Sequence, residues 1–200
     1  MKILGIAHPR SGTGFLAQTL EWLGLNVGHE QNFQNGTVNW LYAVQGEAPP
    51  WYPEEGARPD LSDYDLIIYL VRDPLRVIPS TLTEDPESAR IRRKYISAQP
   101  QQSMIEQAAR SYVEWNRICE GQADVRLRVE DYKIWIPLLA REWLPPREVD
   151  MARFDVSAKT NSRHTNPTTW AKLAQELESS TYKKLVQIAH EYDYETHDGA

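Results

Sequence analysis

The sequence predicts an α/β fold with a central parallel sheet. Three short, continuous apolar segments predict buried strands, and amphipathic segments between them predict helices. The strands are expected at Lys2–Ala7, Asp65–Val71 and Val125–Val129. Because the run LIIYLV within Asp65–Val71 is apolar along its whole length, this strand is expected to be covered on both faces, as the strands of parallel sheets are.

The helices are predicted from apolar residues that recur at helical spacing. Four are expected: Gly12–Leu23, Ser103–Cys119, Pro167–Leu177 and Ser180–Tyr192. The third is expected to begin at Pro167, with Asn166 as its cap. Two polar segments, Asn32–Pro59 and Thr83–Gln102, are expected to run over the surface and to contact a substrate, the second with a short helix around Glu87–Tyr95.

Composition indicates one globular domain over residues 1–200. Hydrophobic residues make up 41% of the chain and charged residues 25%. The net charge of −6 gives no general basic surface, so neither nucleic acid nor an anionic membrane is expected as a partner. Cys119 is the one cysteine, which excludes an internal disulfide. With no apolar run of about 20 residues, a cytoplasmic location is expected.

The first strand is followed by the loop HPRSGTG, His8–Gly14, which leads directly into a helix. Backbone N–H groups at a helix N-terminus bind anions such as phosphate or sulfate, and Arg10 adds a fixed positive charge. The pattern GxxxxGK[ST] of magnesium-dependent nucleotidases fails here, because Ala7, Thr13 and Gly14 stand at its glycine, lysine and hydroxyl positions. The alternative is a proline-glycine turn that only starts a helix.

A second signal follows the LIIYLV strand. Arg72 stands at its carboxyl end, where open α/β sheets bind their ligands. Pro74 favours a helix start after Asp73, which puts Ser80 about two turns along that helix. An arginine and a hydroxyl in this arrangement suit a second phosphate. The alternative is an Arg72–Asp73 pair beside a capped helix.

Together the two segments resemble the sulfotransferases that use 3′-phosphoadenosine 5′-phosphosulfate (PAPS). That family has a P-[KR]-S-G-T-x-[WFL] loop and, later, a strand that ends in R-[ND]-P with a serine at matching spacing. The matching residues here are Pro9, Arg10, Ser11, Gly12, Thr13, Gly14, Phe15, Arg72, Asp73, Pro74 and Ser80. The segment LRVEDY, Leu127–Tyr132, resembles a third family feature, R-x-E-D-[LY].

The resemblance implies a three-layer sandwich with a central parallel sheet, the P-loop nucleotide-kinase-like sulfotransferase fold. It implies PAPS as donor, 3′-phosphoadenosine 5′-phosphate (PAP) as product, and no metal. Arg10 and the Ser11–Phe15 amides would hold the 5′ side, and Arg72 with Ser80 the 3′-phosphate. Arg163, in the segment Lys159–His164, is the candidate that closes over a phosphate, although the family's glycine is missing there. A solvated arginine in a loop is the favoured alternative for Arg163.

Some positions depart from the family pattern. Gly14 stands where many members have a second threonine, and Phe15 where cytosolic members often have a tryptophan that stacks on adenine. For Phe15, a core role is an equal alternative.

Sulfuryl transfer to an alcohol also needs a base near the acceptor hydroxyl. A short strand expected at Leu25–Val27 would deliver His29 and Glu30 to the carboxyl edge of the sheet. Glu30 is the first candidate for the base and His29 the second, and a surface His-Glu pair is the alternative. The histidines show no metal-ligand spacing such as HExxH.

The expected activity is thus transfer of a sulfuryl group to a hydroxyl or amine of a carbohydrate or small molecule. Two other functions stay open: a non-catalytic nucleotide-binding module of the same fold, and a small P-loop kinase. Neither the acceptor nor the oligomeric state is fixed by the sequence.

Overall fold

A computed structural model describes residues 1–44, 60–144, 149–154 and 167–197. These residues form two compact units, and each is described by itself. Unit 1 comprises residues 1–44, 60–71, 122–144 and 149–154, and unit 2 comprises residues 72–121 and 167–197. The expectation of one domain over residues 1–200 stays a prediction.

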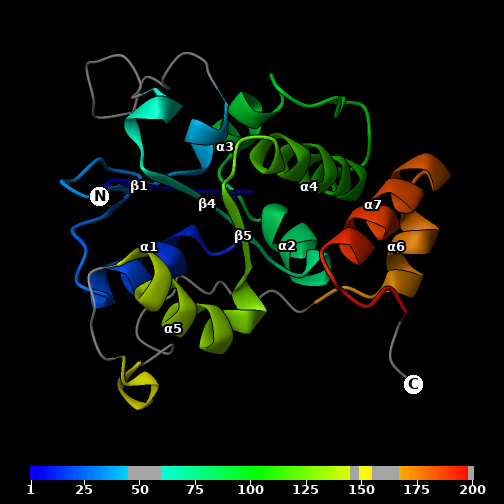
Figure 1. The fold of residues 1–200 in the computed structure, drawn as a ribbon. Helices are drawn as coiled ribbons and strands as arrows, with labels where there is room; N and C mark the ends of the chain where they lie inside the picture. Colours follow the sequence, from blue (N-terminus) through cyan, green and yellow to red (C-terminus); the bar gives the residue numbers. More distant parts are fainter. Residues whose placement is uncertain (45–59, 145–148, 155–166, 198–200) are drawn as a thin grey trace. The chain divides into compact units, whose positions relative to one another are not determined.

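Unit 1 contains a five-stranded sheet in which every neighbouring pair is parallel (Figure 1). The strands, in the spatial order β2-β3-β1-β4-β5, are β2 (Gly28–His29), β3 (Gly36–Val38), β1 (Ile3–Ala7), β4 (Leu66–Val71) and β5 (Val125–Arg128). β1 and β4 pair from Ile3 opposite Leu66 to Ala7 opposite Leu70. All residues of β1 and β4 are buried. This confirms the predicted α/β class and the three predicted strands, whereas the sulfotransferase form of the fold stays a prediction.

The strand order changes direction between β1 and β4. The chain leaves β1 toward β3 and β2 on one side, and it leaves β4 toward β5 on the other. Ligands of open α/β sheets bind outside the carboxyl ends of the strands at such a point. The loop His8–Gly12 follows β1, and Arg72 is the first residue after β4.

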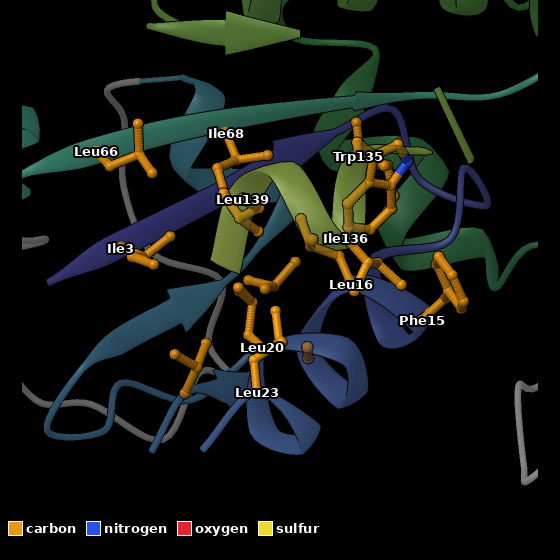
Figure 2. Packing of buried hydrophobic residues seen from close by; sticks show 14 of the residues in the cluster. Ile3, Phe15, Leu16, Leu20, Leu23, Leu66, Ile68, Trp135, Ile136 and Leu139 are labelled. Carbon is orange, nitrogen blue, oxygen red and sulfur yellow. The ribbon is translucent and has the colours of Figure 1, made fainter. Parts of the chain in front are cut away.

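Helices α1 (Thr13–Trp22) and α5 (Tyr132–Trp143) cover one face of this sheet (Figure 1). Their apolar side chains pack against alternate strand residues in one continuous core (Figure 2). The buried contacts join Leu16 and Leu20 of α1, and Ile136 and Leu139 of α5, with the Ile3–Ala7 and Leu66–Val71 strands. Each such side chain contributes about 1.5 to 3 kcal/mol by its burial. The short 3-10 helices of this unit are Trp40–Ala43, Leu61–Asp63, Val129–Asp131 and Met151–Arg153.

Unit 2 is helical in its described residues. Its helices are α2 (Pro74–Thr81), α3 (Pro86–Arg92), α4 (Met104–Glu120), α6 (Trp170–Glu176) and α7 (Ser179–Glu191). α4 and α7 are joined by a buried carboxylate: Glu106 accepts from Arg110 Nε at 2.6 Å, from the Glu178 N–H at 3.0 Å and from the Thr181 hydroxyl. The hydrogen bond to Glu106 raises the pKa of Arg110 above its usual value. Burial raises the pKa of the Cys119 thiol on α4.

Several predicted boundaries need correction. α6 begins at Trp170 rather than Pro167, because the Thr169 hydroxyl caps it by accepting from the Lys172 N–H at 3.2 Å. Asn166, the predicted cap, lies outside the described residues. The short strand expected at Leu25–Val27 instead forms at Gly28–His29. The Trp40 region, expected as part of a surface excursion, is a buried 3-10 helix.

Within the described ranges, no helix is both long and apolar enough to cross a membrane.

Candidate functional site

The loop between β1 and α1 holds an unusual backbone conformation. Arg10 and Gly12 both have positive φ, 74° and 95°, which is uncommon for a residue other than glycine. The Ser11 N–H donates to the His8 carbonyl at 3.0 Å, and His8 Nδ1 donates to the Pro9 carbonyl at 2.5 Å. The buried His8 ring therefore helps to fix the turn. Alternating backbone conformations of this kind turn successive N–H groups toward one side, as in anion-binding nests.

The segment LRVEDY supports this loop from the 3-10 helix Val129–Asp131, which follows β5. A Cβ added at Gly12 would lie 3.4 Å from Val129 Cγ2 and 3.6 Å from Leu70 Cδ2, so the loop backbone runs close over these side chains. The Arg128 guanidinium lies 3.3 Å from the Asp131 carboxylate. Val129 of this motif thus packs under the loop at Gly12. The charged residues of the motif gave no sign of this packing role.

The N-terminus of α1 offers unpaired donors. Its first internal bond runs from the Leu16 N–H to the Gly12 carbonyl at 3.0 Å, and no side chain caps the helix. The N–H groups that precede Leu16 have no partner inside the helix. Among the described residues, the Ser11 hydroxyl is also without a hydrogen-bond partner, although Ser11 is 0% exposed. A buried, unsatisfied hydroxyl costs about 1 to 3 kcal/mol, which is explained if a ligand pairs with it.

Phe15 anchors this helix start in the core. Its ring is 7% exposed and makes edge contacts with Tyr132, Trp135 and Phe154 at centroid distances of 5.9, 6.1 and 6.1 Å. The structure therefore favours the core role of the Phe15 side chain over stacking on a nucleotide base. What this position offers to an anion is its backbone N–H.

His29 lies against the loop. It is the last residue of β2, and its Nε2 is 3.0 Å from the Thr13 hydroxyl oxygen. A Cβ added at Gly14 would lie 3.9 Å from the same ring. Glu30 follows with a φ of 58°, and its N–H donates to the Val38 carbonyl at 3.0 Å. Of the two candidate bases, His29 is the one that contacts the loop through its side chain.

In unit 2, Arg72 precedes α2 and Ser80 lies within it. The Tyr112 hydroxyl donates to the Arg72 carbonyl at 2.8 Å, which fixes the backbone where the chain enters the unit. Asp73 caps α2 by accepting from the Leu75 N–H at 2.8 Å. Ser80 is buried in the last turn of α2, two turns along the helix as predicted.

Among the basic residues of Arg90–Lys94, Arg92 is buried, whereas Arg90, Arg93 and Lys94 are exposed. Arg92 is only 4% exposed and forms an ion pair with Glu84 at 2.6 Å. Arg90 forms a two-point contact with Glu87. The charge of Arg92 is thus balanced inside the unit.

Arg163 and its segment Lys159–His164 lie outside the described residues, so the role of Arg163 stays a prediction. Within the described ranges, no three His, Cys, Asp or Glu side chains gather as metal ligands.

Comparisons of the chain with protein-family models, with curated proteins and with solved structures found no match. The resemblance to sulfotransferases therefore rests on the motif residues alone.

Proposed function

We propose that the protein is a sulfotransferase that moves a sulfuryl group from PAPS to a hydroxyl or amine of a carbohydrate or small molecule. The observation that carries this proposal is the buried, unpartnered hydroxyl of Ser11 beside the uncapped N-terminus of α1. The Ser11 hydroxyl and the first backbone N–H groups of α1 are both hydrogen-bond donors that lack an acceptor there. A bound oxyanion would be the acceptor for both.

The loop suits the 5′ phosphosulfate of this donor. Bound PAPS supplies an activated sulfuryl group, which carries less charge than a phosphoryl group. Backbone amides and one cation can therefore hold it without the lysine and magnesium ligand that the loop lacks. Arg10, which is half-buried in the loop, is the group that stabilises the charge developing on the bridging oxygen.

His29 is the proposed base. Its Nε2 is committed to Thr13, so Nδ1 is the nitrogen that takes the proton from the acceptor hydroxyl or amine. The geometry reverses the order expected from the sequence, since Glu30 makes no side-chain hydrogen bond or ion pair with any described residue. Glu30 stays the second candidate.

Arg72 and Ser80 are proposed to bind the 3′-phosphate. This assignment comes from the motif; Arg72 precedes α2 by two residues, and Ser80 lies in the last turn of that helix. A guanidinium suits a phosphate because its N–H groups match two phosphate oxygens.

Calorimetry with PAP tests the nucleotide site. We expect Arg72→Ala to weaken PAP binding by about tenfold or more, because a charge-assisted contact contributes over about 1.4 kcal/mol, while binding of adenosine 5′-phosphate stays the same. Arg76→Ala is the matched control, since Arg76 lies on α2, is exposed and pairs only loosely with Asp73 at 3.9 Å. Equal PAP binding by the Arg72 and Arg76 variants would remove the 3′-phosphate assignment.

Turnover is tested separately with a labelled sulfate donor and a panel of acceptors. Transfer that proceeds without magnesium supports the proposal. Tight PAP binding with no transfer to any acceptor would favour the non-catalytic module, and magnesium-dependent use of ATP would favour the kinase.

A further inference from the structure

We propose that the Thr13 hydroxyl couples donor binding to the tautomer of His29, so that an anion on the loop prepares the base. Thr13 is then a positioning residue that acts through His29. This inference rests on the proposed function in one respect, namely that an anion binds at His8–Gly14.

The contact between Thr13 and His29 holds a single proton. The two heavy atoms are 3.0 Å apart, a hydrogen-bond distance at which one partner donates and the other accepts. A threonine hydroxyl has one proton, and a neutral imidazole has one protonated and one unprotonated nitrogen. Only two arrangements therefore satisfy the contact: the hydroxyl donates to Nε2, or Nε2–H donates to the hydroxyl oxygen.

Whether an anion is bound at the loop determines which of these two arrangements forms. Thr13 is the first residue of α1 and is only 9% exposed, so its hydroxyl lies among the uncapped N–H groups of the helix. An anion bound there accepts hydrogen bonds but donates none. When the hydroxyl donates to the anion, it has no proton left for the ring, and Nε2 must carry the proton. The neutral ring then has its lone pair on Nδ1, the form that a base requires.

No charged neighbour competes with Thr13 for the ring. α1 carries one titratable residue, Glu21, and β3 carries none. The remaining charged or titratable groups nearby in the chain are His8, Arg10 and Glu30. Within the described part of the chain, the His29 side chain makes no hydrogen bond or ion pair besides the one to Thr13. The ring is exposed, so it exchanges protons with solvent and can change tautomer when the loop fills.

The test is nitrogen NMR of protein with ¹⁵N-labelled histidine at about pH 8, where an ordinary histidine is neutral. PAP is the probe, and the spectrum of His29→Gln assigns the His29 signals. We expect saturating PAP to shift the tautomer ratio about tenfold toward Nε2–H, since the hydrogen bond to a charged group contributes about 1.5 kcal/mol or more. Thr13→Val, which keeps the side-chain shape, should abolish the shift, and Thr13→Ser should restore it.

The outcomes separate this inference from the proposed function. If the wild-type protein binds no PAP, the donor site itself fails. If PAP binds but the His29 nitrogen signals do not move, or move equally in Thr13→Val, the coupling is refuted while the donor site stands. If Thr13→Val binds PAP more weakly and its His29 nitrogen signals do not move on binding, both the donor site and the coupling are supported.

Discussion

Replacing Ser11 by alanine should stabilise the ligand-free protein against unfolding and weaken its binding of PAP. The Ser11 hydroxyl is buried and unpartnered. Its removal should relieve part of a cost of about 1 to 3 kcal/mol, and we expect the free energy of unfolding of Ser11→Ala to rise by about 1 kcal/mol. In the complex the same hydroxyl pairs with an anion, so PAP affinity should fall by about tenfold. Urea unfolding and calorimetry measure the two quantities.

Thr19 provides the matched control. It is also fully buried on the segment that follows the loop, but its hydroxyl donates to the Phe15 carbonyl at 2.8 Å. Thr19→Val should therefore lose about 0.5 to 1.5 kcal/mol of stability and keep its PAP affinity. If Ser11→Ala instead loses stability and binds PAP as tightly as the wild type, the Ser11 hydroxyl is structural and the reasoning is refuted.

Four further substitutions test the fold. Glu106→Gln should lower the free energy of unfolding by at least about 2 kcal/mol, because it removes a buried charge acceptor. Glu178→Ala, which keeps the backbone donor to Glu106 and loses an exposed ion pair with Arg110 and a hydrogen bond from Gln102 at 3.3 Å, should cost less than about 1 kcal/mol in the same urea titration. Gly36→Ala should cost about 3 kcal/mol or more or prevent folding, since φ is 110° and the new Cβ would lie 2.0 Å from the Ile3 carbonyl oxygen; a soluble variant with wild-type stability would contradict this. Because burial raises the pKa of the Cys119 thiol, the unfolded chain ionises first, and stability should fall as pH rises above about 8.5. Cys119→Ala should remove that part of the decline, and an unchanged pH profile would show that other groups cause it.

The strands that carry strong local signals could be predicted from the sequence, and those held by distant partners could not. Asp65–Val71 was predictable because its apolar run fits only a buried strand, and β4 forms within it. β3 has only three residues, Gly36–Val38, and it exists because it pairs with β1. α5 was missed because it contains Pro137, which lacks an N–H, and burial of its apolar face against the sheet outweighs that defect.

In the candidate site, too, features with a local sequence signal could be predicted, and features that depend on distant contacts could not. The sequence HPRSGTG indicated an anion-binding turn, since its residue types are those that such a turn needs. The sequence ranked Glu30 before His29 as the base, because it does not show that the His29 side chain reaches Thr13, a residue 16 positions earlier in the chain. The unpartnered state of Ser11 was equally hidden, since burial of a single hydroxyl leaves no pattern in the sequence.

The placement of Phe15 in an aromatic cluster has a thermodynamic consequence for binding. Because the first turn of α1 is held in the core by that ring, the loop need not fold around its ligand. Binding that orders a disordered segment buries a large apolar area and gives a large negative heat-capacity change. For this loop we expect a small one, set by the area of the nucleotide alone, and little loss of conformational entropy.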